Sequence, residues 1–132
     1  MIEWDTAFRR DLDSTNWIEG DIRRDYSALL DPQADLAVGC GYLFLLQKFL
    51  DYAREHNVPL IVKSASEKRA RLVIDYVITR PVEPKIARAM PIIAEEITRR
   101  SRKVCERCGD PGQPQIIRGG IMSVHVGQTE AA

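Results

Sequence analysis

Apolar residues recur with a helical period in the segment from residue 41 to residue 56. They stand three or four residues apart, with charged or amide side chains between them, at Leu43, Leu46, Phe49, Leu50 and Ala53. This period is that of an amphipathic α-helix that turns one face to a core. Asn57 and Pro59 follow directly and predict the end of the helix.

Two strands are predicted after this helix. Residues 59–63 are short and rich in branched aliphatic side chains, and residues 69–79 alternate between two faces. Alternation with a period of two is typical of a half-buried β-strand. The polar residues 64–69 between the two segments predict a hairpin turn.

A second amphipathic helix is predicted after residues 80–84. Its inward positions recur at helical spacing, at Ile86, Met90, Ile93, Ile97 and Ser101. Pro91 lies inside this pattern. Because proline has no N–H to donate to the preceding turn, we expect Pro91 to kink the helix or to restart it.

The amino-terminal third of the chain has a weaker pattern. Short helices are predicted over residues 4–12 and 18–30, and turn clusters at residues 14–16 and 31–33. Trp4 and Trp17 lie in this region, where we expect them to act as packing anchors.

The fold class that these elements predict is α+β, with a short antiparallel sheet packed with two main helices, plus a C-terminal knuckle and hairpin. The hairpin joins strand candidates at residues 115–118 and 121–126 through Gly119-Gly120. The length of 132 residues fits a single domain with its own core.

Within this single domain, residues 1–132, we expect three parts. Residues 1–40 form a less regular N-terminal layer, residues 41–103 form a helix-hairpin-helix core, and residues 104–132 form a knuckle-like tail.

Composition narrows the class of protein. The chain is 45% hydrophobic and 29% charged, as in an ordinary soluble protein. No apolar stretch reaches the about 20 residues that span a bilayer, and the first residues lack the pattern of a signal peptide. We therefore expect a cytoplasmic protein. Its three cysteines are an odd number and fit reduced thiols better than a disulfide framework.

The net charge is zero, but the two signs are unevenly placed. Residues 1–60 carry 11 acidic and 6 basic side chains, whereas residues 61–132 carry 8 acidic and 13 basic ones. This division gives the molecule an electrical polarity if the two halves occupy different surfaces.

Cys105 and Cys108 have the spacing of half a zinc knuckle. Two such thiolates can reach one tetrahedral Zn²⁺, but a structural site needs four protein ligands. His125 is the strong ligand that follows, and Asp110, Glu106, water or another chain could complete the set. Two interpretations compete with a Zn cofactor: a structural turn that has lost its metal, which we favour, and a redox dithiol.

The motifs along the chain resemble those of a group of small, uncharacterised bacterial and phage-associated proteins. The resemblance is carried by Gly41-Tyr42, Val62-Lys63, the strand at residues 72–76, Ala94-Glu95, Ser101 and the Cys-x-x-Cys-Gly-x-Pro-Gly block at residues 105–112. Members of the group typically close with Cys-x-x-His, which here falls on Val126 and Thr129. The resemblance implies a fold and a degenerate knuckle, and it implies no established reaction.

Cys40 offers an enzyme-like alternative. It lies between two glycines at the start of the strongest helix, where the helix dipole lowers the pKa of a thiol. Together with His125 it has the outline of a small cysteine amidase or peptidase. The competing interpretation, which we favour, is a buried structural cysteine. His56, in the last turn of the same helix, is interpreted as a helix cap or a solvent contact.

Basic residues offer a nucleic-acid alternative. Residues 68–71 and the run Arg99, Arg100, Arg102 and Lys103 could contact phosphate, although a solvated helix end is the simpler interpretation. Our leading expectation is a non-enzymatic cytosolic protein that binds a protein partner, as an accessory, inhibitor or immunity-type protein of a mobile element. The alternatives are a zinc-knuckle nucleic-acid-binding regulator and the cysteine hydrolase.

Overall fold

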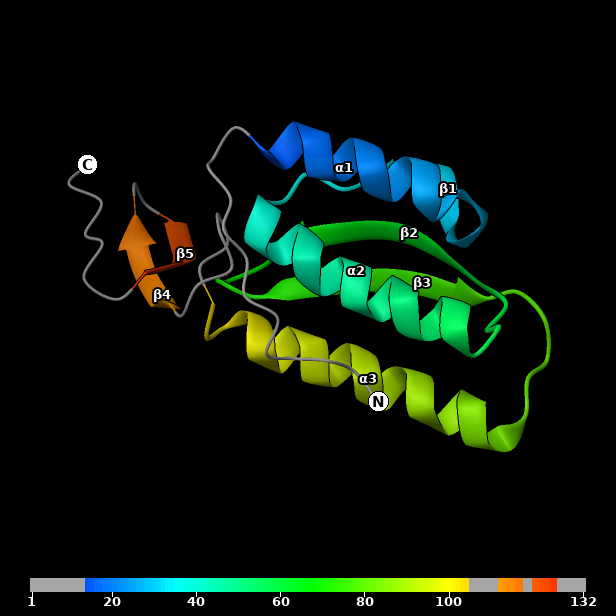
Figure 1. Cartoon of the computed structure of the whole chain (residues 1–132). Coiled ribbons are helices and arrows are strands. Elements are labelled where there is room, and N and C mark those ends of the chain that lie inside the picture. Colours follow the sequence, from blue (N-terminus) through cyan, green and yellow to red (C-terminus); the bar gives the residue numbers. More distant parts are fainter. Residues whose placement is uncertain (1–13, 105–111, 118–119, 126–132) are drawn as a thin grey trace.

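The computed structural model describes residues 14–104, 112–117 and 120–125, with side chains described for residues 18–104. The elements in the first range are α1 (Ser14–Asp25), η1 (Ser27–Leu29), β1 (Leu30–Asp35), α2 (Cys40–Glu55), β2 (Leu60–Glu67), β3 (Leu72–Ile78) and α3 (Pro84–Ser101). A separate pair of strands, β4 (Gly112–Ile117) and β5 (Gly120–His125), lies beyond the end of α3 (Figure 1).

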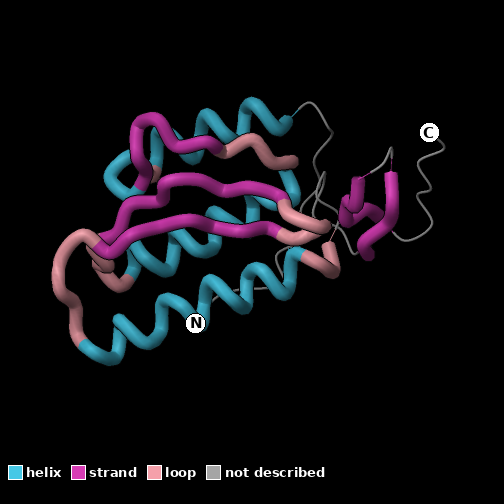
Figure 2. Tube along the Cα trace, turned by 180° about the vertical axis from the view of Figure 1, so that it is seen from behind, coloured by secondary structure: helices cyan, strands magenta, loops and turns pink. Residues whose placement is uncertain are grey.

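The first three strands form one mixed sheet in the order β1-β2-β3. β1 and β2 are parallel and are connected through α2, whereas β2 and β3 form an antiparallel hairpin. The three helices lie on the same face of this sheet, and no helix of the described residues covers the other face (Figure 2). The fold is therefore a two-layer α+β arrangement.

The predicted α+β class is confirmed. The helix at residues 41–56, the antiparallel pairing of the two strands after it, and the C-terminal strand pair are all present. The described residues contain one α-helix, α1, in addition to the two main helices that were predicted. The weak helix predicted over residues 4–12 and the side chains of Trp4 and Trp17 lie outside what the structure describes.

The turn predicted at residues 31–33 is wrong, because these residues lie within β1. β1 is an edge strand, where the proline at position 32 is tolerated because a ladder hydrogen bond is not needed on its free side. Asp31 also holds β1 to β2, since its carboxylate accepts a hydrogen bond from Lys63 Nζ at 2.9 Å. This bond, and a second one from the Gln33 N–H, lower the pKa of Asp31.

The predicted boundaries of the hairpin and of two helices also differ. The helix predicted over residues 18–30 is α1, which begins at Ser14, so the turn predicted at residues 14–16 is wrong. It ends at Asp25, and a single helical turn then leads into β1. β2 extends through residues 64–67, which were assigned to the turn, because Ala65 faces the core while its serine neighbours are only partly covered. α3 continues through Pro91. The Ala87 carbonyl, which would have accepted the missing N–H of Pro91, belongs to an exposed residue, so water can satisfy it.

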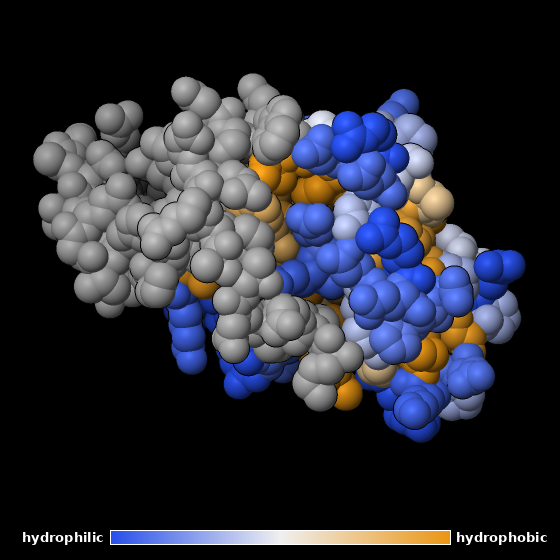
Figure 3. All heavy atoms as spheres, in the orientation of Figure 1, coloured by the Kyte–Doolittle hydropathy of each residue, from blue (hydrophilic) through white to orange (hydrophobic). Residues whose placement is uncertain are grey.

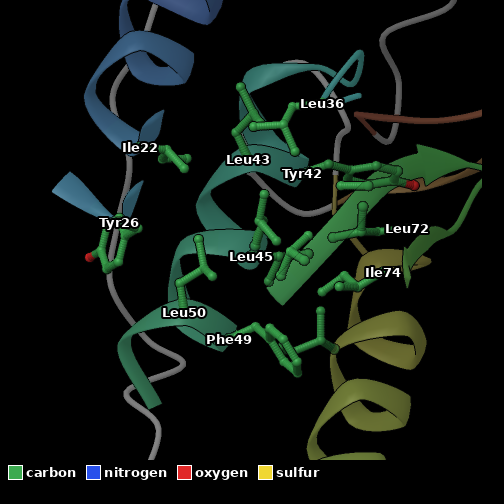
Figure 4. Packing of buried hydrophobic residues seen from close by; sticks show 14 of the residues in the cluster. Ile22, Tyr26, Leu36, Tyr42, Leu43, Leu45, Phe49, Leu50, Leu72 and Ile74 are labelled. Atoms are coloured by element: carbon green, nitrogen blue, oxygen red, sulfur yellow. The ribbon is translucent and has the colours of Figure 1, made fainter. Parts of the chain in front are cut away.

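The core lies between α2 and the sheet. Tyr42, Leu43, Leu46, Phe49 and Leu50 of α2 are 0% exposed, and they pack in one cluster with side chains of all the other main elements. Figure 4 shows this cluster, with residues of α1, α2 and β3 directed toward one another. Burying each such side chain stabilises the fold by about 1.5–3 kcal/mol relative to an exposed one.

Where residues drawn in grey do not cover it, the outer surface of the helical layer is largely hydrophilic, with hydrophobic atoms between the helices (Figure 3). Within the part of the chain that the structure describes, none of the helices combines the length and the hydrophobicity of a membrane span.

A polar network joins Tyr26, the residue that follows α1, to α2. The Tyr26 hydroxyl donates a short hydrogen bond to Asp51, and Arg54 lies over the Tyr26 ring at 4.4 Å from its centroid. Burial of Tyr26 raises the pKa of its hydroxyl, and the hydrogen bond to Asp51 raises it further. The phenol therefore stays protonated and remains a donor to the carboxylate.

The end of α2 is fixed by its backbone. Val58 N–H donates to Ala53 O at 2.8 Å and Asn57 N–H donates to Arg54 O at 3.2 Å, the pair of bonds of a Schellman motif. Asn57 has a φ of 52°, the left-handed conformation that this motif requires. His56 Nδ1 lies 3.0 Å from the Tyr52 carbonyl oxygen, and its ring stacks on the Tyr52 ring. The predicted capping role of His56 is thereby confirmed.

Ser101 links the end of α3 to the start of β3. Its hydroxyl accepts a hydrogen bond from Leu72 N–H at 2.7 Å and donates one to Thr98 O at 2.5 Å. Ser101 is the buried polar residue of the described core, at 0% exposure. Both hydrogen bonds of its hydroxyl are therefore shielded from water.

Replacing Ser101 with alanine is expected to lower the free energy of unfolding by about 1–3 kcal/mol, because the buried Leu72 N–H would lose its acceptor. Urea denaturation measures the effect. The half-buried Ser66 is the matched control, and Ser66→Ala should change the free energy of unfolding by less than about 0.5 kcal/mol. Equal losses for the two variants would contradict the assigned role of Ser101.

Candidate nucleic-acid interface

Two basic segments that are far apart in the sequence meet at one end of the molecule. One is the turn between β2 and β3, and the other is the last turn of α3 together with the residues after it (Figure 1). The Leu72–Ser101 hydrogen bond joins residues 29 positions apart and fixes the two segments side by side. We call this surface the basic end, formed by Lys68, Arg69, Arg71, Arg99, Arg100, Arg102 and Lys103.

The turn in the basic end has a strained backbone. Lys68 and Arg71 exchange both backbone hydrogen bonds, so that Arg69 and Ala70 alone make the loop. Their φ angles are 54° and 64°, as in a type I′ turn, for which Asn-Gly is the favoured sequence. Each non-glycine residue in this conformation costs about 1–2 kcal/mol.

Two contacts hold this strained turn in place. Ala70 is 0% exposed, so its methyl group is packed inside. Its N–H donates to the Glu67 carboxylate at 2.6 Å. With Ala70 anchored in this way, the side chain of Arg69 stands exposed at the tip of the hairpin.

The end of α3 supplies the other half of the basic end. Glu96 accepts hydrogen bonds from both Arg99 and Arg100, the second at 2.7 Å from Arg100 Nε. Arg102 and Lys103 follow the last helical residue and are exposed. Cations at this position also suit the negative end of the helix dipole.

The charge of this surface is strongly positive. Residues 67–71 and 96–103 together carry seven cationic side chains and two carboxylates, a net charge of +5. Both carboxylates already accept hydrogen bonds from the protein. The arrangement can therefore attract and hold a ligand that carries several negative charges, such as a phosphate backbone.

The side chains of the predicted zinc ligands lie outside the part of the chain that the structure describes. Cys105 and Cys108 lie outside the described residues, and His125 belongs to β5 but its side chain is not described. Among the described residues, no group of three or more histidine, cysteine or acidic side chains could hold a metal. The zinc site stays a prediction.

Cys40 is placed where a nucleophile would not reach a substrate. It begins α2, is 0% exposed and belongs to the hydrophobic core. A buried thiol in apolar surroundings packs as a small hydrophobic side chain. This burial argues against the cysteine hydrolase alternative and favours the structural interpretation of Cys40.

The sequence predicts the two groups of basic residues but not that they lie side by side in the fold. It gave no role to Glu67, Ala70 or Glu96, which shape the surface through a carboxylate–amide bond and two ion pairs. One signal was available: a charged i, i+3 and i, i+4 pattern from Glu96 to Arg99 and Arg100 predicts ion pairs on a helix.

Comparison with known proteins does not assign the chain to a family. No family model, curated protein or solved structure matches the chain.

Proposed function

We propose that this protein binds the phosphate backbone of nucleic acid through the basic end, and that it acts without catalysis. One observation supports the proposal above all. Two basic segments lie side by side because a buried hydrogen bond joins Leu72 to Ser101, 29 positions along the chain. Arginine and lysine contacts to phosphate supply most of the affinity of sequence-independent nucleic-acid binding. The buried state of Cys40 supports the non-enzymatic part of the proposal.

The backbone strain in the turn further supports a functional surface. A hairpin selected for stability alone would carry Asn-Gly where this chain has Arg69-Ala70. Strained residues are retained most often where they position a side chain for binding. Here the strained position holds a guanidinium at the tip of the hairpin, beside the cations of α3.

The expected ligand is recognised by charge and not by base sequence. If the net charge of five is matched by phosphates, the logarithm of the binding constant should fall against the logarithm of salt concentration with a slope of about −4.5. The dissociation constant at physiological salt should lie between about 10⁻⁶ and 10⁻⁴ M. Fluorescence anisotropy with two labelled duplexes of unrelated sequence measures both quantities.

A control on α3 tests whether the basic end is the site. Arg88 is exposed near the start of this helix, and Arg88→Gln should leave affinity and slope unchanged. Arg102→Gln should weaken binding and reduce the slope by about 0.9. Undetectable binding at low salt, or equal losses for the two variants, would overturn the proposal.

Arg69→Asn should change stability and binding in opposite directions. Asparagine tolerates the left-handed conformation, so the free energy of unfolding should rise by about 0.5–1 kcal/mol. The lost guanidinium should weaken nucleic-acid binding and reduce the salt slope by about 0.9. Urea denaturation and anisotropy measure the two effects.

Arg71→Gln is the matched control for this variant. Arg71 lies just after the strained positions, so its replacement should weaken binding without any gain in stability. A gain in stability with unchanged binding by the Arg69 variant would show that the turn is not part of the interface.

Glu96→Gln should strengthen nucleic-acid binding. The carboxylate pairs with Arg99 and Arg100, so its removal takes one negative charge from the basic end and releases Arg99 from its ion pair. We expect a tighter dissociation constant and a salt slope steeper by about 1. Glu95→Gln makes the same change in net charge at the neighbouring exposed residue, so an equal gain there would contradict a specific role of Glu96.

A further inference from the structure

The end of the molecule opposite the basic end is hollowed on both sides of one short segment. A hollow of about 580 Å³ is lined in part by His56, Arg80, Val82, Glu83 and Ile86. A second hollow of about 390 Å³ is lined in part by Asp25, Leu29, Arg54, Ile61 and Thr79. Asn57, Val58, Pro59 and Arg80 line both, so the two hollows adjoin.

Arg80 is the charged group common to the two hollows. It is exposed, and within residues 18–104 its guanidinium has no hydrogen-bond or ion-pair partner. Arg54, in contrast, already bonds Asp51 and stacks on Tyr26. A cation of this kind, set between two partly apolar hollows, complements a carboxylate flanked by apolar groups.

Exposed apolar side chains lie at the same end. Ile61, which lines the second hollow, is paired across the sheet with Val77, and Val77 is 44% exposed. Ile78 is 37% exposed and precedes Thr79 and Arg80. These large hydrophobic residues enlarge the apolar surface around Arg80, as at the centre of many protein interfaces.

The walls of the two hollows are held in place before any ligand arrives. Thr79 N–H and Thr79 Oγ1 both donate to the Pro59 carbonyl, at 2.7 and 2.9 Å. The Schellman motif fixes the adjoining Asn57 and Val58. A surface that is ordered in advance loses less conformational entropy on binding.

We infer that this end docks an extended acidic segment of a partner protein. One carboxylate of the segment pairs with Arg80, and apolar side chains on either side of that carboxylate enter the two hollows. In an extended segment, side chains two residues apart point to the same face, which suits this order of groups. This inference is independent of nucleic-acid binding, and it gives a site to the partner protein expected from the sequence.

A probe peptide with Leu-Ser-Glu-Ser-Leu repeats places leucine and glutamate on one face and tests the inference directly. The matched peptide has glutamine in place of glutamate. Fluorescence anisotropy should show tighter binding of the glutamate peptide, and Arg80→Gln should weaken it roughly tenfold. The same variant should not change binding of the glutamine peptide, and Arg88→Gln should change neither.

Glu83 supplies a test of the opposite sign. Its carboxylate lines the first hollow and repels an acidic segment, so Glu83→Gln should tighten binding of the glutamate peptide. Thermal denaturation confirms that the exposed Arg80 and Glu83 variants are folded. Weaker binding of the glutamate peptide to the Glu83→Gln variant would overturn the inference.

Amide chemical shifts locate the peptide on the full chain. Expected changes fall on Asn57, Val58, Ile61, Thr79 and Arg80. Changes confined to residues 68–71 and 99–103 would show that the peptide is held by the basic end, and would overturn the inference. Self-association that Arg80→Gln abolishes, seen by sedimentation, would assign the surface to a second copy of the chain and would overturn it as well.

Discussion

The burial of α2 is the constraint on which the rest of the structure depends. Most residues of this helix are buried, and they pack against α1, α3 and the sheet. α2 also connects the two parallel strands, so its position sets where β1 meets β2. Both proposed binding surfaces depend on its position, because Asn57 follows the end of α2 and the sheet under α2 carries the basic turn.

The strongly periodic parts of the fold could be predicted from the sequence. The helix at residues 41–56 combines a clear apolar face with stop residues, so local and tertiary preferences agree. β1 could not be predicted, because Asp31 and Pro32 are turn formers and only their edge position in the sheet allows them in a strand. Periodicity carries no information about which segments become neighbours across a sheet.

The candidate sites, like the fold, could be predicted only in part from the sequence. The basic residues of the turn and of α3 are visible as charge runs, but their union depends on a hydrogen bond between Leu72 and Ser101. Arg80 had no signal in the sequence, since a single arginine after a strand belongs to no periodic pattern. The role that we propose for Arg80 rests on its position between two hollows, which only the folded structure shows.

The parallel pairing of β1 with β2 has a consequence for how the chain acquires its structure. β1 has hydrogen-bonding partners only in β2 among the described strands, and β2 begins at Leu60. During synthesis, α1 and β1 therefore emerge from the ribosome before the strand that completes them. Helix formation in α2 is local and fast, whereas the β1–β2 contact closes a long loop and is slow. β1 therefore waits for its strand partner until β2 has been synthesised, although it leaves the ribosome first.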